Sequence, residues 1–179
     1  MRHVLHYCLM LATAVAAVTV FAEEPHISRE AIEWCNIWIP DANGTKLPRV
    51  LDQCRFDVVH FNNGLHGWGY SEAEYRKHFP QLVATIREHA PKAKLIWAAT
   101  TPMRKAGDLT VVAEGTNRVK ARNQIAEEFV AREGIAVDDL YGLVQDHLEY
   151  WSADGVHFNG KGIDVQAEQV SRRIAENLK

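Results

Sequence analysis

The chain has little of what marks the specialised protein classes. Its 179 residues include three cysteines, six prolines and a formal net charge of −3. So few cysteines exclude a disulfide-dense mini-protein, and the small negative charge gives no electrostatic reason to expect nucleic acid as a partner. Hydrophobic residues at 47% and charged residues at 24% exclude a disordered or collagen-like chain and are typical of one globular domain.

Long apolar runs are also absent, except at the start of the chain. One Arg and one His precede an apolar run from Val4 to Ala22, which ends in small residues suited to cleavage. This pattern predicts a signal peptide over residues 1–22, cleaved after Ala22, and a secreted or periplasmic domain over residues 23–179. The alternative is an uncleaved anchor, for which the run is only marginally long enough. No later segment is apolar enough to cross a membrane.

Cleavage after Ala22 would leave Cys35 and Cys54 as the two cysteines of the mature chain. The first is expected at the start of a strand and the second at the end of the following helix, on the same side of a βα unit. A disulfide between them is geometrically possible. Two buried thiols are the alternative.

Short apolar segments alternate with amphipathic ones along the rest of the chain. Strands are predicted at 36–39, 56–61, 94–99 and 135–137, and helices at 47–54, 71–89 with a break near Pro80, 117–133, 138–145 and 161–178. Residues 100–114 are predicted as a long loop. The order predicts an α/β fold of three layers, α/β/α, around a mainly parallel sheet. Function is expected beyond the carboxyl ends of the strands, in loops 40–46, 62–70, 99–116 and 150–160.

Asp154 and His157 form the sharpest local signal, just before the last predicted helix. A carboxylate three residues from an imidazole can hold the ring in one tautomer and stabilise its protonated form, which is the orienting half of a catalytic triad. The competing interpretation is a surface loop in which the two residues meet by chance.

A second signal is the run His60 to His66, which follows a buried strand. Gly64 would let the backbone approach a ligand, Asn63 lies beside it, and His66 could donate a hydrogen bond into the same space. In the alternative interpretation, His60 is a core residue and the asparagines form a turn. For His60 itself the core interpretation is favoured.

Together these motifs resemble the SGNH (GDSL-type) hydrolases, a family of esterases and acyl hydrolases, over about residues 36–179. The run FDVVHFNNGLHGW is similar to a subgroup with Gly-Leu-His where the family has Gly-x-Asn-Asp, so His66 replaces the oxyanion-hole asparagine. The family's Asp-x-x-His matches Asp154 and His157. The segment LIWAATTP, Leu95 to Pro102, also looks like the strand and loop that follow.

The resemblance implies a flavodoxin-like fold and hydrolysis of a small-molecule or glycan ester, without a cofactor or metal. It implies that His157 is the general base and that Asp154 orients it. The N–H of Gly44 and the ring of His66 would hold the oxyanion, with Gly64 and Asn63 beside them.

The sequence departs from the family at the nucleophile, because it contains no Gly-Asp-Ser. Among its four serines, Ser28 lies nearest to the place expected for the nucleophile, but no Gly-Asp precedes it. Cys35 could supply a thiol nucleophile, but it is expected to begin a strand, away from the site. The first family strand is therefore expected to be missing or replaced, with about 30 residues lacking before Glu30. Two explanations stay open. Either the gene has lost the segment that carries the nucleophile, or the start of the protein has been assigned at the wrong place.

The departure leaves three hypotheses. The first is an ester hydrolase impaired by the absent serine. The second is a non-catalytic remnant that binds a carbohydrate or acyl ligand through the loop aromatics Trp68, Tyr70, Tyr150 and Trp151. The third, which is disfavoured because His60 is expected to point into the layers of the fold, is a metal site from His60, His66, Asp154 and His157.

Overall fold

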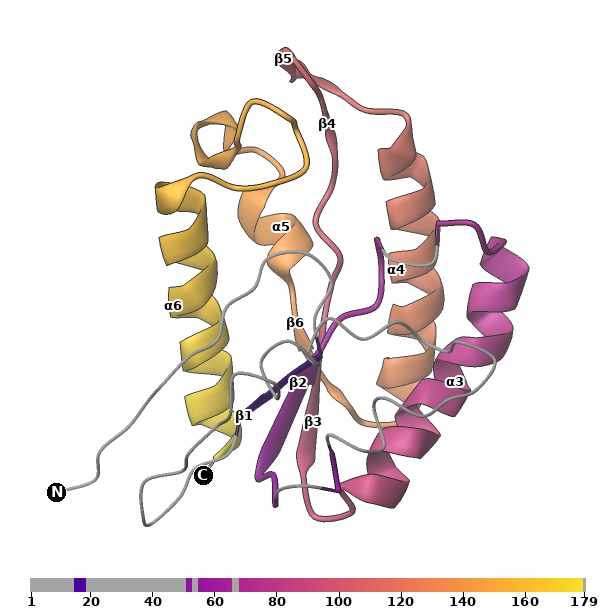
Figure 1. Ribbon diagram of the computed structural model, residues 1–179. Helices are drawn as coiled ribbons and strands as arrows, with labels where there is room; N and C mark the ends of the chain where they lie inside the picture. The colour runs from indigo at the N-terminus through magenta and orange to yellow at the C-terminus, as the bar shows by residue number, and fades with distance from the viewer. Residues whose placement is uncertain (1–14, 19–50, 53–54, 66–67, 179) are drawn as a thin grey trace, which may run out of the picture.

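The computed structural model describes residues 15–18, 51–52, 55–65 and 68–178 (Figure 1). Its strands are β1 (Val15–Val18), β2 (Val58–Phe61), β3 (Lys94–Ala98), β4 (Arg104–Lys105), β5 (Asp108–Val112) and β6 (Ala136–Asp138). Its helices are α3 (Glu72–His89), α4 (Gly115–Arg132), α5 (Leu140–Val144) and α6 (Gly160–Asn177), with a 3-10 turn at Leu148–Tyr150.

A four-stranded sheet with the order β1-β2-β3-β6 forms the centre of the molecule. The pairs β2–β3 and β3–β6 are parallel, with Phe61 opposite Trp97 and Ala98 opposite Asp138. The two parallel crossovers return through α3 and α4 over one face of the sheet, and α6, which follows β6, covers the other face. The predicted α/β fold with a mainly parallel sheet is confirmed.

The edge of β2 away from β3 pairs with β1, which runs antiparallel to it. Ala16 lies opposite His60 and Val18 opposite Val58. The strand beside β2 therefore comes from the apolar N-terminal segment that the sequence marks as a signal peptide. A chain cleaved after Ala22 would lack this strand.

Each face of the sheet has its own hydrophobic core. Val59 and Phe61 pack with Leu95 and Trp97 against α3 and α4, in a cluster that includes Phe79, Leu82, Ile86, Ala126 and Val130. On the other face, Val58 and Ile96 pack against Val170 and Ile174 of α6. Figure 1 shows α3 and α4 on one side of the sheet and α6 on the other. The alternation of side chains along β2 and β3 thus divides the two cores.

Helix α3 begins at a capping box, in which the Ser71 hydroxyl accepts the N–H of Glu74 and the Glu74 carboxylate accepts the N–H of Ser71. The predicted break near Pro80 is wrong, because one helix runs from Glu72 to His89. A proline inside a helix costs about 3 kcal/mol. Here the buried face around Phe79 packs on the sheet and keeps the helix continuous.

Residues 100–114 do not form the long loop that the sequence predicts. They contain β4 and β5, an antiparallel hairpin that projects beyond the main sheet (Figure 1). Gly107 adopts φ of 78° in its turn, a conformation that costs glycine little, and the Thr-Val-Val run of β5 favours a strand. Asp138 also ends β6 rather than beginning a helix.

Several predictions fall outside the described residues. They include the strand at 36–39, most of the helix at 47–54, and the pairing of Cys35 with Cys54. Within the described part of the chain, no helix combines the length and apolarity that a membrane span needs.

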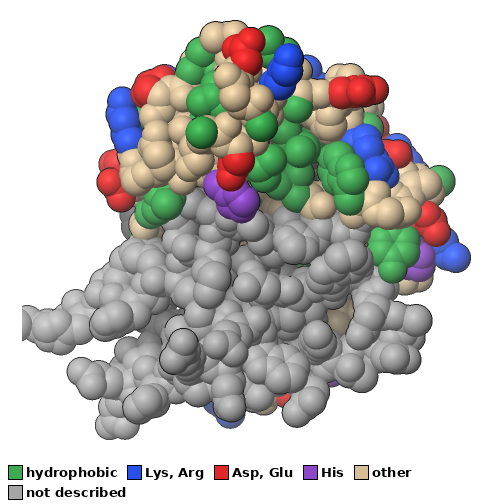
Figure 2. Space-filling model, turned by 45° about the horizontal axis from the view of Figure 1, so that its top comes forward, with side chains coloured by type: hydrophobic (Ala, Val, Ile, Leu, Met, Phe, Trp, Pro, Cys, Tyr) green, Lys and Arg blue, Asp and Glu red, His purple; other side chains and the backbone are tan. Residues whose placement is uncertain are grey.

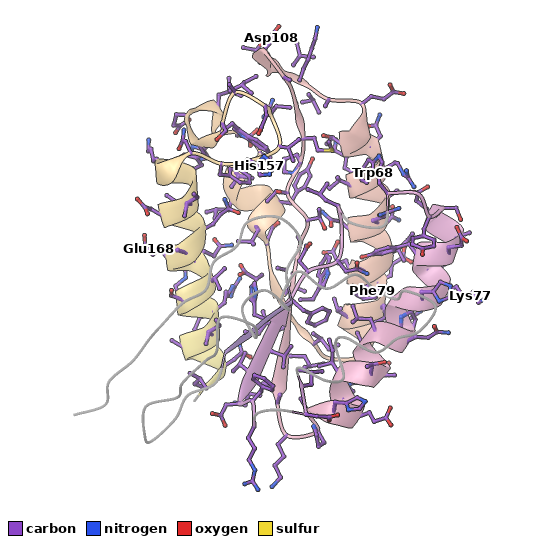
Figure 3. All side chains as sticks on the ribbon, viewed as in Figure 1. Trp68, Lys77, Phe79, Asp108, His157 and Glu168 are labelled. Carbon is purple, nitrogen blue, oxygen red and sulfur yellow. The ribbon has the colours of Figure 1, made fainter. Side chains whose placement is uncertain are left out.

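Replacing Phe79 with Ala is expected to lower the free energy of unfolding by about 3–5 kcal/mol, because it leaves a cavity in the larger core. The Phe79 ring is 1% exposed and lies between the rings of Phe61, Tyr75, Trp97 and Phe129, at centroid distances of 5.5–6.4 Å. Lys77→Ala is the control, since Lys77 is exposed on the same helix (Figure 3). Urea unfolding of both variants makes the comparison, and equal midpoints would contradict it.

Candidate active site

Polar side chains gather beyond the carboxyl ends of β2, β3 and β6, where a parallel sheet is expected to carry its site. They come from residues 62–65 and 68–70 after β2, residues 99–116 after β3, and residues 150–160 before α6. Figure 3 shows His157 and Trp68 in this region, above the sheet and below Asp108 at the hairpin tip. Figure 2 shows hydrophobic side chains gathered over the same end of the molecule.

The structure brings Asp154 and His157 together. The Nδ1 atom of His157 lies 2.7 Å from Oδ2 of Asp154, and the other oxygen, Oδ1, accepts the backbone N–H groups of Val156 and His157 at 2.8 Å each. One carboxylate therefore closes a turn and also reaches the ring three residues on. This explains why the spacing is Asp-x-x-His, and it makes the turn and the pair a single unit.

These donors hold the Asp154 carboxyl ionised. The backbone N–H of His157 is the largest cause that lowers its pKa from 3.8 to about 2, followed by the N–H of Val156 and the His157 ring. Because an ionised carboxylate only accepts hydrogen bonds, Nδ1 of His157 carries the proton of the neutral ring. The lone pair is then on Nε2, which has no partner among the described residues. That nitrogen can act as a base.

Both side chains of the pair are open to solvent. His157 is 56% exposed and Asp154 is 50% exposed, so a substrate can reach them. Their conformation is set by the backbone around them. Gly155 has φ of 71°, and Ser152 donates its N–H to the carbonyl of His157.

Gly64 is placed differently from what an oxyanion donor requires. It is buried, and its N–H donates to Oδ1 of Asn62 at 3.1 Å. A Cβ at this position would lie 1.6 Å from the Thr100 hydroxyl oxygen. Glycine here permits the loops after β2 and β3 to approach closely, and Asn63 is the half-buried residue before it.

Arg122 of α4 is a site-building residue that the sequence reasoning missed. Its guanidinium is 1% exposed and donates to the carbonyls of Gly64 at 3.0 Å and Tyr70 at 2.8 Å. It also lies over the rings of Trp68 and Tyr75, 5.3 Å from each centroid. The available signal was its helical spacing, three residues after the core residue Val119.

Asn123, the next residue of α4, holds the loop after β3. Its Oδ1 accepts the N–H of Thr100 at 2.9 Å, and its Nδ2 donates to the Thr100 carbonyl at 2.8 Å. Asn62 donates to the Thr100 hydroxyl at 2.9 Å and to the Ala98 carbonyl at 2.7 Å. The loops after β2 and β3 are thereby joined to each other and to one helix.

His60 belongs to the core, as expected. It is 5% exposed and its Nε2 lies 2.8 Å from Oδ2 of Asp138, which is fully buried. Gln169 of α6 donates to the other oxygen of Asp138 at 2.7 Å. Among the described residues no group of three or more His, Cys, Asp or Glu side chains could hold a metal ion, and His66 lies outside them.

The rings of Trp68, Tyr150 and Trp151 pack against neighbouring side chains, whereas Tyr70 is 39% exposed. Trp151 is 4% exposed with its ring 4.5 Å from Phe158, and Tyr150 stacks on His147 at 4.6 Å. Trp68 faces the guanidiniums of Arg118 and Arg122.

The remaining predicted site residues, which are Gly44, His66, Ser28 and Cys35, lie outside the described residues. The other three serines lie in α3's cap, in α6 and on the loop of His157. Ser71 caps α3, Ser171 donates its hydroxyl to the carbonyl of Ala167 within α6, and Ser152 lies on the His157 loop.

The described residues thus form a layered α/β domain with an Asp–His pair beyond the carboxyl ends of its parallel strands. The model of the GDSL-like lipase/acylhydrolase family matches residues 40–165, and the chain belongs to this family. None of the curated proteins compared with the chain matches it.

Solved structures share the fold. The lipase/acylhydrolase from Enterococcus faecalis is 25% identical with a TM-score of 0.53, covering 69% of this chain and 63% of its own. A GDSL-like lipase from Bacteroides thetaiotaomicron is 17% identical with a TM-score of 0.56, covering 67% and 62%. A peptidoglycan O-acetylesterase is 17% identical with a TM-score of 0.57, covering 73% and 40%. The chain thus spans less than two thirds of the length of each.

The Asp154 carboxyl is expected to titrate with a midpoint of about 2, measured by the ¹³C shift of its Cγ against pH. In His157→Ala both backbone donors remain, so the pKa should stay below 3.8. Because the folded pKa is depressed, ionised Asp154 stabilises the native state above about pH 4, and this contribution is lost as the pH falls through about 2. A wild-type midpoint at 3.8 would contradict the geometry.

Gly64→Ala is expected to destabilise the fold by about 1–3 kcal/mol, because the new methyl group would overlap Thr100. Gly69→Ala is the matched control in the same loop, since nothing lies within 4 Å of a Cβ there. Thermal unfolding of the two variants measures the difference, and a Gly64 variant as stable as the Gly69 variant would refute the close approach.

Proposed function

We propose that the chain is an ester hydrolase of the GDSL type in which His157 is the general base and Asp154 orients it, with turnover impaired by the absence of the Gly-Asp-Ser serine. The observation that carries this proposal is the 2.7 Å contact between His157 Nδ1 and Asp154 Oδ2 on a solvent-open loop. The contact leaves Nε2 of His157 as the basic atom.

The geometry supports a definite division of roles. In ester hydrolysis of this kind a hydroxyl attacks the carbonyl carbon while a base takes its proton, and the same group returns the proton to the leaving alcohol. Nε2 of His157 fits that role. The Asp154 carboxylate stabilises the charged ring that forms between the two transfers, and the N–H of Gly44 and the ring of His66 are the proposed donors to the oxyanion.

Impairment follows from the missing attacking group. Loss of a nucleophile costs about 10⁴–10⁶ in rate in enzymes of this kind, even where the base stays in place. Of the serines, Ser28 would be the replacement, and it lacks the Gly-Asp that precedes the family's serine. A chain of these 179 residues should therefore bind an ester at the pair and turn it over poorly.

The substrate we propose is a small-molecule or glycan ester met outside the cytoplasm. The N-terminal apolar segment supports secretion or a periplasmic location. The peptidoglycan O-acetylesterase among the structures of the same fold acts on a glycan ester, which makes that class the first to try. The proposal requires no cofactor.

Hydrolysis of p-nitrophenyl acetate tests the proposal with two histidine variants. His157→Ala removes the base, and His147→Ala is the matched control, because His147 is also an exposed histidine, at 47%, and is paired with Glu149 at 3.1 Å. We expect wild type, His157→Ala and His147→Ala to release nitrophenol at the same low rate. A rate that falls in His157→Ala alone would show that the chain holds its own nucleophile and is not impaired.

Ester binding is measured separately by NMR. Adding p-nitrophenyl acetate should shift the ring signals of His157 and leave those of His147 in place. If neither ring responds, the ester-directed role of the pair is wrong.

A further inference from the structure

The base of the β4–β5 hairpin is tied to helix α4 by one hydroxyl. Thr116 is 1% exposed and lies in the first turn of α4. Its Oγ1 accepts the N–H of Met103 at 2.8 Å and donates to the carbonyl of Met103 at 2.8 Å. Met103 directly precedes β4. One side chain therefore bonds to both backbone polar groups of Met103, whose carbonyl also accepts the N–H of Ala113 at 3.0 Å.

The hairpin is in turn bonded to the loop of the Asp–His pair. Arg104 of β4 donates its N–H to the carbonyl of Gly155 at 2.7 Å, and Gly107 donates its N–H to the carbonyl of Ala153 at 3.2 Å. These two carbonyls flank Asp154. Figure 3 shows His157 below the hairpin tip that Asp108 marks.

Gly155 is the point of closest approach. Its φ of 71° is unfavourable for other residues, and a Cβ built on it would lie 2.2 Å from the carbonyl oxygen of Arg104. A side chain at 155 would have to push β4 away from the loop. Since Asp154 and His157 are both half-exposed, packing of their own side chains does little to hold them.

We propose that the β4–β5 hairpin is a positioning element for the Asp154–His157 pair, and that Thr116 and Gly155 are its positioning residues. Thr116 fixes the hairpin to α4, the hairpin backbone fixes the carbonyls of Ala153 and Gly155, and the turn between them presents Asp154 to the ring. The catalytic meaning of this inference rests on the proposed function, but the positioning itself is a property of the fold.

Gly155→Ala should displace the loop from β4 and weaken the bonds to Asp154. The expected result is a rise in the measured pKa of Asp154 by about one unit or more toward 3.8, with loss of the low-field ¹H signal of the His157 Nδ1–H. Gly134→Ala is the matched control. Gly134 also has a positive φ, 63°, and nothing lies within 4 Å of its Cβ, so it carries the backbone strain without the clash.

Thr116→Val supplies a second test that keeps the volume of the side chain. It removes both bonds to Met103 and should therefore raise the pKa of Asp154 and remove the His157 Nδ1–H signal. Thr116→Ser retains the hydroxyl, so both signals should stay as in the wild type. This variant decides the question if Gly155→Ala does not fold.

The two readouts separate positioning from stability and from activity. A merely structural role would lower the thermal midpoint of Gly155→Ala or Thr116→Val and leave the Asp154 titration and the Nδ1–H signal of the folded protein unchanged, and that result overturns the proposal. Because neither signal depends on turnover, failure of the ester assay would count against the proposed function and not against the hairpin's role.

Discussion

The parallel pairing of β2, β3 and β6 is the constraint on which the site depends. It brings the carboxyl ends of three strands to one edge, so that the loops after β2 and β3 must meet there. The chain reaches the same edge again before α6, with the loop that carries Asp154 and His157. No local preference could place these three segments together, because they lie up to about 100 residues apart in the chain.

Helix α4 converts this meeting of loops into a fixed arrangement. Thr116 holds the start of the β4–β5 hairpin, Arg122 holds the carbonyls of Gly64 and Tyr70, and Asn123 holds both backbone groups of Thr100. Arg122 and Thr116 are buried, where a hydrogen bond is costly to leave unmade. One helix thus bonds to the loops after both β2 and β3, which lie at the same edge of the sheet as the Asp–His pair.

Two of the Asp–His pairs among the described residues show how the surroundings of a pair decide its role. His60 and Asp138 are buried, and Gln169 occupies the second oxygen of the carboxylate. His157 and Asp154 have the same contact between ring and carboxylate on an open loop, with backbone donors on the second oxygen. The first pair joins β2 to β6 and α6, while the second leaves a basic nitrogen facing outward.

The sequence by itself determined the fold class and the Asp154–His157 pair. The spacing of apolar residues indicates a helix or a strand wherever one face is buried. Asp154 and His157 lie within one turn, so both signals are local in the sequence. The hairpin at 104–112, the continuous helix through Pro80 and the buried Arg122 depended on the tertiary structure. Each is stabilised by a partner distant in sequence: Arg104 by Gly155, Phe79 by the sheet, Arg122 by the carbonyl of Gly64. Such contacts exist only once the strands are paired. The sequence therefore predicted that Gly64 faces a ligand, and only the fold shows that it lies against Thr100 of the next loop.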